Sequence, residues 1–239
     1  MDIEILYEDK DILAINKPSG LVVHGDGRTE EKTLVDWFVY KYPESKDIGE
    51  SLVDKDGKKI DRSGVVHRLD RETSGVLLLA KTQTGFDNLK SQFQTRNVEK
   101  EYHAFVYGKV KLDKGIINRP IGRSGKDFRK KTAQRGSRGQ TREAVTEYET
   151  ILRSNNYSFL YVFPKTGRTH QIRVHFKAIN YPLVADKLYS GRQENTLGFE
   201  RLALHAYSIT FVDLRGEKMS ATAPYPADFE LALEKLQSE

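Results

Sequence analysis

Residues 67–80 read HRLDRETSGVLLLA, a charged and polar stretch that passes directly into five apolar residues. A short apolar run with turn signals at its ends is typical of a buried strand, so we predict a loop over 67–75 and a strand over 76–80. Asp70 lies between Arg68 and Arg71, and neighbouring cations favour the ionised form of a carboxylate. From these residues alone, Asp70 is either a catalytic carboxylate or an acid that caps a turn and pairs with an arginine.

The chain around this stretch mixes strand and helix signals without regular alternation. Helical spacing predicts a helix opened by Thr33 and others near 86–93, after Gly167 and at the C-terminus, whereas residues 44–64 predict a long surface loop. Further strands are predicted over 3–7, 12–15, 102–110, 144–152, 159–163 and 202–212. The pattern predicts an α+β fold with a mixed, largely antiparallel central sheet flanked by helices and loops. We expect one catalytic domain over 1–239, in which two lobes could meet at a cleft across the sheet.

Composition narrows the class of protein. The chain has 239 residues, of which 38% are hydrophobic, and it has no cysteine, which excludes disulfides, thiolate metal sites and a cysteine nucleophile. Asp2 and Glu4 stand where a secretory signal would carry positive charge, and no stretch approaches the roughly 20 apolar residues of a membrane span. We expect a soluble, cytoplasmic protein that is a monomer and does not bind membranes.

Positive charge is concentrated in residues 119–142, the basic segment. The formal net charge of the chain is +5, whereas this segment has nine basic residues and one acid, Asp127, a surplus of 9 − 1 = +8. Its glycines predict a flexible loop rather than a helix face. Such a loop is either a solvated surface or a clamp for phosphates, because neutralising phosphates releases counterions.

Other interpretations of the polar residues fit less well. His170 and His175 are five apart and lie on different faces of a helix or strand, so no metal site is expected. The 67–75 loop is similar to a kinase catalytic loop, but its aspartate is one position too far along and no Asp-Phe-Gly motif accompanies it. A retaining glycosidase would need a second carboxylate about 5 Å from Asp70, and nothing beyond closeness in sequence marks Glu72 as that partner.

Five motifs in a fixed order carry a family resemblance over about residues 11 to 210. They are K-P-x-G…H at 17–24, H-R-L-D-R-x-T-S-G at 67–75, K-x-Y-x-A-x-V-x-G at 100–108, T-G-R-T-H-Q-I-R-V-H at 166–175 and L-x-L-H-A at 202–206. On these motifs the chain resembles the RluA family of pseudouridine synthases. The resemblance implies the catalytic fold of that family and an isomerase that breaks the N-glycosidic bond of a uridine, turns the base and rejoins it through carbon.

The resemblance also implies roles for individual residues. Asp70 is the essential carboxylate, and its step is attack on the ribose, attack on the base or abstraction of a ribose proton. Tyr102 packs against the uracil and removes the proton from its new carbon attachment point, and Arg173 pairs with Asp70. Arg68 enters the space left by the nucleotide, since chemistry on a stacked base requires flipping it out. The residues expected to line the cleft are Lys17, His24, His67, Thr169 and His170, of which His67 orients the loop.

No cofactor is implied, because both fragments stay bound and no redox change occurs. The expected partner is an rRNA or tRNA stem-loop, with Arg129, Lys130 and Lys131 on its phosphates. A catalytically silent RNA-binding relative is the alternative, although neither Asp70 nor Tyr102 is replaced. Many relatives carry an N-terminal S4 RNA-binding domain, which we do not expect here. The motifs indicate the reaction, whereas the contacts that choose the uridine are expected in the loops over 44–64 and 119–142.

One stretch departs from the family pattern. Residues 180–189 align with the family pattern G-x-P-[IL]-x-G-D-x-x-Y, but Asn180 and Ala185 stand where relatives often have glycine. We expect both in a turn that requires positive φ, which Asn supplies readily and Ala poorly.

Overall fold

The computed structural model describes residues 1–25, 31–53, 57, 59–134 and 137–238. The chain forms two compact units, the first comprising Met1–Glu99 and Ala206–Pro224, the second Lys100–His205 and Tyr225–Glu239. Helices and sheets occur in both units, and the strand pairs described below by register are antiparallel. The α+β class and the largely antiparallel pairing predicted from the sequence are therefore confirmed.

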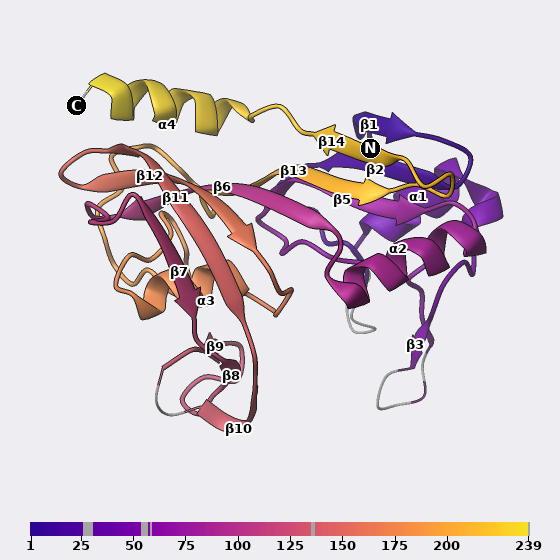
Figure 1. The fold of residues 1–239 in the computed structure, drawn as a ribbon, viewed down its shortest axis with the longest axis horizontal. Coiled ribbons are helices and arrows are strands. Elements are labelled where there is room, and N and C mark those ends of the chain that lie inside the picture. Colours follow the sequence, from indigo (N-terminus) through magenta and orange to yellow (C-terminus); the bar gives the residue numbers. More distant parts are fainter. Residues whose placement is uncertain (26–30, 54–56, 58, 135–136, 239) are drawn as a thin grey trace. The chain divides into compact units, whose positions relative to one another are not determined.

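The first unit is built around the apolar run that follows the 67–75 loop. This run lies in β5 (Ser74–Ala80), which is buried along its whole length. The strand order is β1 (Ile5–Glu8), β2 (Ile12–Lys17), β5, β13 (Leu204–Val212) and β14 (Lys218–Thr222) (Figure 1). One hydrophobic core cluster of this unit consists of Ile12, Ala14, Val76, Leu78, Leu89, Val98, Ile209, Phe211, Ala221 and Ala223.

Two helices complete the first unit. α1 (Leu34–Lys41) begins at the predicted Thr33, whose side chain and that of Asp36 form a capping box with the backbone. α2 (Gln83–Thr95) buries Leu89 in the core, and the side-chain amide of Gln92 bonds both backbone groups of Val212 in β13, at 2.7 and 2.8 Å. Both helices lie where the apolar spacing predicted them.

The second unit is a sheet with a helix on each face. Its strands are β6 (Glu99–Tyr107), β12 (Tyr157–Pro164), β11 (Val145–Arg153) and β7 (Lys114–Asn118), in that order. Successive side chains of β6 alternate between faces, so Ala104 and Val106 pack with Phe176 of α3 (Gln171–Ala178), while Phe105 packs with Phe229 of α4 (Ala227–Ser238) (Figure 1). Packing against the sheet therefore positions α3, the helix that carries Arg173.

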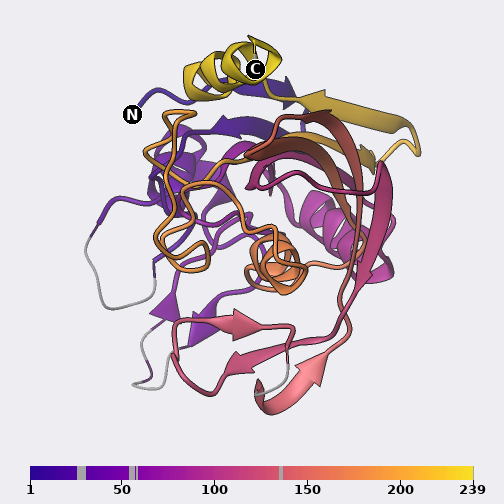
Figure 2. The same cartoon turned by 90° about the vertical axis from the view of Figure 1, so that its left-hand side faces the viewer.

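The basic segment is not the flexible loop that its glycines predicted. It contains β8 (Ile121–Ser124), β9 (Lys131–Thr132) and β10 (Ser137–Arg142), which form a small antiparallel sheet in the order β10–β8–β9 (Figure 2). A Cβ atom on Gly122 would come within 2.9 Å of the Ser137 Cβ, so this glycine permits close packing of two strands rather than mobility. Arg135, one of the nine basic residues counted above, and Gly136 lie outside the described residues.

Short polar elements account for the other differences from the sequence prediction. β7 and β14 were not predicted, because their five residues alternate only weakly between apolar and polar. The expected surface loop over 44–64 includes the 3-10 turn η1 (Pro43–Ser45) and the paired strands β3 (Leu52–Val53) and β4 (Lys59–Ile60). Pairing with a neighbouring strand, rather than local propensity, decides whether such short segments form strands.

The turn predicted at Asn180 and Ala185 is confirmed. Asn180 has φ +68° just beyond the end of α3, and Ala185 has φ +56° directly before Asp186. Both conformations are left-handed, and an alanine there brings its Cβ against the backbone carbonyl. The chain thus tolerates local strain immediately before Asp186.

Replacing Ala185 with glycine should relieve this strain. We expect Ala185→Gly to raise the free energy of unfolding by about 0.5–1 kcal/mol, since the removed strain exceeds the extra entropy of glycine in the unfolded chain. Asn180→Gly is the matched control and should change stability less, because asparagine populates this conformation readily. Chemical denaturation of the three proteins measures the difference, and a destabilised Ala185→Gly variant would contradict the interpretation.

Candidate active site

The end of the 67–75 loop is fixed by close packing. Gly75 has φ +109°, and a Cβ atom there would come within 2.1 Å of the Ala206 carbonyl oxygen in β13. Both the backbone conformation and the space exclude any other residue at this position. Thr73 and Ser74 before it are buried, and the backbone N–H of Thr73 donates to the carbonyl of Asp70 at 3.1 Å. The loop therefore reaches Asp70 from a rigid strand.

A buried lysine, Lys17, holds the 67–75 loop by a hydrogen bond to its backbone. The side chain of Lys17 is 0% exposed, and its ammonium group donates to the carbonyls of Pro18, Leu21 and Arg71 at 2.8, 2.9 and 3.1 Å. The backbone N–H of Gly20 donates to the same Arg71 carbonyl. Lys17 was expected to line a cleft, but it lies beneath the loop, because three carbonyls satisfy its three N–H groups there.

The start of the loop is attached to β5 and α2 through His67. The backbone N–H of Leu78 donates to Nε2 of His67 at 2.9 Å, and the ring stacks on Phe93 with 4.6 Å between centroids. The Nε2 atom is therefore an acceptor, which makes Nδ1 the protonated nitrogen of the neutral ring. These contacts give His67 a position from which it orients the loop.

The two arginines that flank Asp70 in sequence have other partners in the structure. Arg71 binds Glu31 through both terminal nitrogens, at 2.8 and 2.5 Å. Nη1 of Arg68 lies 3.2 Å from Nε2 of His24, whose Nδ1 lies 2.9 Å from the Gly25 carbonyl. Arg68 is exposed, as an inserting residue must be, and Asp70 is half-buried.

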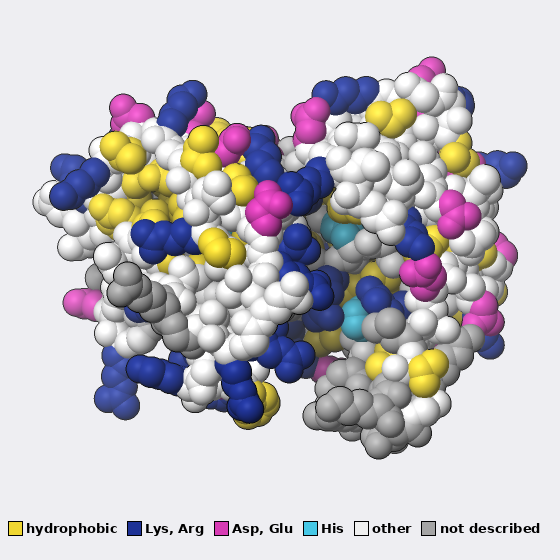
Figure 3. Space-filling view, turned by 60° about the horizontal axis from the view of Figure 1, so that its bottom comes forward, with side chains coloured by type: hydrophobic (Ala, Val, Ile, Leu, Met, Phe, Trp, Pro, Cys, Tyr) yellow, Lys and Arg dark blue, Asp and Glu magenta, His cyan; other side chains and the backbone are white. Residues whose placement is uncertain are grey.

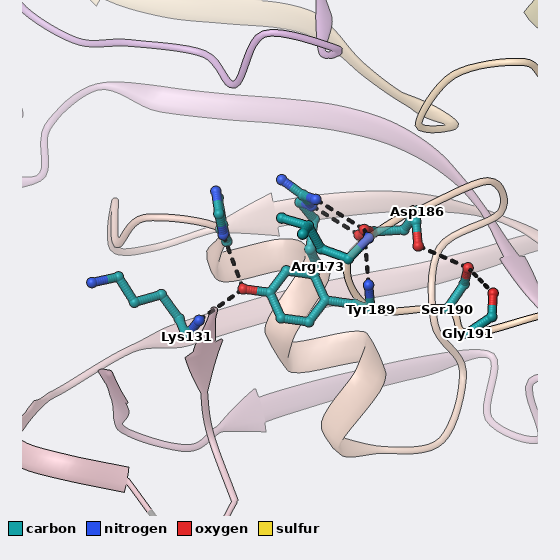
Figure 4. A network of polar contacts seen from close by, with 8 residues as sticks. Lys131, Arg173, Asp186, Tyr189, Ser190 and Gly191 are labelled. Atoms are coloured by element: carbon teal, nitrogen blue, oxygen red, sulfur yellow. Dashed lines mark hydrogen bonds and ion pairs between the residues drawn. The ribbon is translucent and has the colours of Figure 1, made fainter. Parts of the chain in front are cut away.

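In the second unit, Arg173 on α3 is held by a buried carboxylate. Its Nε and Nη2 donate to the two oxygens of Asp186 at 2.8 and 2.9 Å, and the two side chains are 8% and 0% exposed (Figure 4). The guanidinium carbon lies 5.1 Å from the centroid of the Tyr189 ring, a cation–π distance. Asp186 also accepts from the backbone N–H groups of Leu188 and Tyr189. The predicted pairing of Arg173 with Asp70 stays a prediction.

The hydroxyl of Tyr189 connects this pair to the basic segment. It accepts from the backbone N–H of Lys131 at 2.8 Å and lies 2.9 Å from Nδ1 of His170 (Figure 4). His170 precedes α3 with φ +57°, a strained conformation for a non-glycine residue. Strain of this kind often occurs at functional sites. Next to it, Thr169 is exposed.

Tyr102 lies on β6, opposite Val162 of β12. Its ring is half-buried and packs against the core cluster that includes Ile172 and Phe176 of α3. The strand and the helix thus restrict the aromatic ring on one side and leave part of it accessible. A phenol in such a position can contact a base with its ring and exchange a proton through its hydroxyl.

The β8–β9 turn of the basic segment is preorganised. The Ser124 hydroxyl accepts from the backbone N–H groups of Lys126 and Asp127, and the Asp127 carboxylate accepts from the backbone and the guanidinium of Arg129. Phe128 projects from this turn with 90% of its side chain exposed. Exposed cations around an exposed aromatic ring suit a single-stranded nucleic acid, since phosphates bind the cations and a base stacks on the ring.

Among the described residues, no three histidine, aspartate or glutamate side chains cluster as metal ligands would. Within the same part of the chain, no helix combines the length and apolar character required to cross a membrane.

A profile of the RNA pseudouridylate synthases matches residues 11–178, which include the Lys17, Asp70, Tyr102 and Arg173 described above. The chain belongs to this family. It is 38% identical over 232 residues to an uncharacterized RNA pseudouridine synthase of Synechocystis sp., covering 97% of this chain and 68% of the relative. It is 36% identical over 254 residues to a protein of Pseudomonas aeruginosa named ribosomal large subunit pseudouridine synthase D, covering 100% of this chain and 73% of that protein.

Solved structures agree with the fold. The human RNA Pseudouridylate Synthase Domain Containing 4 superposes with a TM-score of 0.75 at 26% identity, covering 98% of this chain and 93% of that one. The human RNA Pseudouridylate Synthase Domain Containing 1 has the same TM-score at 24% identity, covering 94% and 84% of the two chains. This RNA pseudouridine synthase is therefore an isomerase, as the motifs implied.

Sequence reasoning missed three residues of the site. Asp186 and Tyr189 occupy the fixed Asp and Tyr positions of the 180–189 stretch, where the two missing glycines are the more conspicuous feature. Phe128 was missed because the prediction for the basic segment rested on charge alone, although an aromatic residue between cations is a recognisable signal for nucleic-acid binding. Only Arg173 of the buried pair was identified, because a pattern does not show which acid faces a given base.

The Arg173–Asp186 pair should be essential for stability. Asp186→Asn removes the charge partner of a buried guanidinium and should lower the free energy of unfolding by about 3 kcal/mol. Asp228→Asn is the control, because Asp228 forms the same two-pronged contact with Arg201, but those side chains are 29% and 15% exposed. The free energy of unfolding of Asp228→Asn should fall by less than about 1 kcal/mol. Equal losses in denaturant titrations would show that burial does not set the importance of Arg173.

Proposed function

We propose that this RNA pseudouridine synthase uses Asp70 as its essential carboxylate, with Tyr102 against the uracil and Arg173 as the accompanying cation. The observation that carries the proposal is the fixation of the Asp70 loop. Lys17 and Gly20 hold it at Arg71, and Gly75 fixes its exit into β5. A reacting group must be held within a fraction of an ångström, and these contacts hold the loop in the way that this requires.

Arg173 is suited to keep a carboxylate ionised and aimed. Its guanidinium is fixed by Asp186 through Nε and Nη2 and by the ring of Tyr189, so it does not reorganise during the reaction. A positioned cation favours the charged form of the acid that it faces. Tyr102 would contact the uracil through the accessible part of its ring and take the proton from the carbon that joins the ribose.

The isomerisation balances without a further reactant. The bond from the ribose to the uracil nitrogen breaks, a bond to the uracil carbon forms, and the proton of that carbon leaves to a base. The nitrogen gains a proton. Because the nucleotide must leave the stack first, Arg68 would occupy the space that it vacates. The exposure of Arg68, in contrast to the buried Arg173, fits a side chain that enters the RNA.

The proposed substrate is ribosomal RNA of the large subunit, modified in the cytoplasm by a monomeric enzyme. Support comes from the name of the Pseudomonas aeruginosa relative and from the basic segment. Figure 3 shows Lys and Arg side chains gathered in its left-hand part, where β8–β10 lie. Arg129, Lys130 and Lys131 would bind the phosphates, with tRNA as the alternative substrate. A silent RNA-binding protein is disfavoured, because Asp70 and Tyr102 are both present.

Removing the charge of Asp70 tests the catalytic assignment. Asp70→Asn should lower pseudouridine formation by roughly 10³-fold or more while RNA affinity stays within a few-fold of the wild type. Mapping of pseudouridine in total RNA from a deletion strain, complemented with either protein, measures the activity and identifies the site. Substantial turnover by the variant would sink the assignment, and release of free uracil instead of retained pseudouridine would indicate a hydrolase.

Neutralising the basic segment tests its role in binding. The triple variant Arg129→Gln, Lys130→Gln and Lys131→Gln should bind RNA more weakly, with a slope of log affinity against log salt that is flatter by about one for each phosphate that is no longer neutralised. The control triple Lys109→Gln, Lys111→Gln and Lys177→Gln removes the same charge from exposed positions of the same unit. Filter binding at several salt concentrations compares them. Identical slopes in both variants would make the segment an ordinary solvated surface.

A further inference from the structure

A second arginine lies close to Arg68 in the first unit, and the reaction described above does not use it. Arg62 sits in a turn fixed by its neighbours: Asp61 accepts from the backbone N–H and the hydroxyl of Ser63 at 2.8 and 2.6 Å. The Arg62 carbonyl accepts from Val65, and Gly64 donates to Ile48. The Arg62 backbone is thus as firmly held as the Asp70 loop that follows it.

The guanidinium of Arg62 has an unsatisfied donor. Its Nε atom is buried and, within the part of the chain that the structure describes, has no hydrogen-bond partner. Burial and the charge of Arg68 both lower the pKa of Arg62. A buried N–H without an acceptor destabilises a fold, and such a group in a native protein calls for an explanation such as a functional role or a bound water or ion.

Arg68 and His24 complete the surroundings. Burial lowers the pKa of His24, and the charges of Arg68 and Arg62 lower it further, so the ring is neutral. The neutral ring donates from Nδ1 to the Gly25 carbonyl and accepts from Arg68 at Nε2. His24 therefore orients Arg68 without neutralising its charge. Arg68 thus donates to an uncharged acceptor, and its positive charge also acts on Arg62.

Two acids of the first unit are engaged with other cations. Glu50, whose charge reaches Arg62, forms an ion pair with Lys90, and Glu31 binds Arg71. Among the described residues, neither Arg62 nor Arg68 forms an ion pair with a carboxylate. Their charges are thus not balanced in the way that those of Arg71 and Lys90 are.

We propose that Arg62 and Arg68 form a binding site for one phosphodiester group of the RNA substrate, a site that rests on the proposed function. Planar guanidinium groups bind the two non-bridging oxygens of a phosphate through paired N–H donors. Arg62 is the half-buried member of the site and Arg68 the exposed one. Arg62 precedes Asp70 by eight residues in the chain. A phosphate bound by Arg62 and Arg68 would anchor the RNA strand that carries the target nucleotide.

The test compares Arg62→Gln with Arg62→Lys and with Arg215→Gln, an exposed, ion-paired arginine of the same unit. Arg62→Gln should weaken RNA binding about 10-fold and flatten the salt slope by about one, and Arg62→Lys should recover part of the affinity. Arg215→Gln should change neither by more than about 2-fold. Equal melting temperatures of the variants establish that the fold is intact.

A set of RNAs, each with one uncharged methylphosphonate linkage, then locates the phosphate. With the wild type, one position should lower affinity about 10-fold, and with Arg62→Gln the same position should have no effect. If the uncharged linkage lowers the RNA affinity of both proteins equally at every position, the proposal is wrong. The effect of the same position on Arg215→Gln should match the wild type.

Inorganic phosphate tests the site without RNA. Titrated into the free enzyme, it should shift the NMR signals of the His24 ring in a saturable manner, and Arg62→Gln should weaken this binding at least 5-fold. Saturable binding with no isomerase activity would overturn the proposed function and leave the site standing. Unshifted His24 signals together with unchanged RNA affinity of Arg62→Gln would overturn the site, whatever the activity.

Discussion

The burial of a single ammonium group, that of Lys17, is the constraint on which the Asp70 loop depends. A charge removed from water destabilises a protein by several kcal/mol unless every N–H finds an acceptor. Lys17 finds three backbone carbonyls, and one of them belongs to Arg71, directly after Asp70. The loop cannot move away from β2 without leaving this charge unsatisfied, so the position of Asp70 follows from the requirement to satisfy Lys17.

The second unit uses the same physical principle with a different pair of groups. Arg173 is buried and therefore requires Asp186, and Asp186 in turn requires the backbone of residues 188 and 189. That requirement fixes the Tyr189 hydroxyl, which holds the basic segment through Lys131. The left-handed conformation of Ala185 is tolerated because it delivers Asp186 to this place. Burial of charge thus stabilises each functional group where propensity alone would not.

The arginines of the first unit divide into satisfied and unsatisfied ones. Arg71 binds Glu31, whereas Arg68 binds the neutral His24 and Nε of Arg62 is buried without an acceptor among the described residues. The unsatisfied guanidinium groups suit a ligand that brings its own negative charge, and RNA brings one at every phosphate. Stability and function therefore place opposite demands on neighbouring residues of one short stretch.

The sequence by itself determined the family, the reaction and the main elements, because these depend on local patterns: the 67–75 motif, the apolar run of β5, the capping box of Thr33 and the positive φ of Asn180 and Ala185. Tertiary structure alone decided the partners. Lys17 was expected to line a cleft but is buried beneath the Asp70 loop. The basic segment forms a sheet and not a loop, and Arg173 pairs with Asp186. A sequence pattern shows which residues carry charge, but only the folded chain shows which of those charges are buried and therefore must be paired.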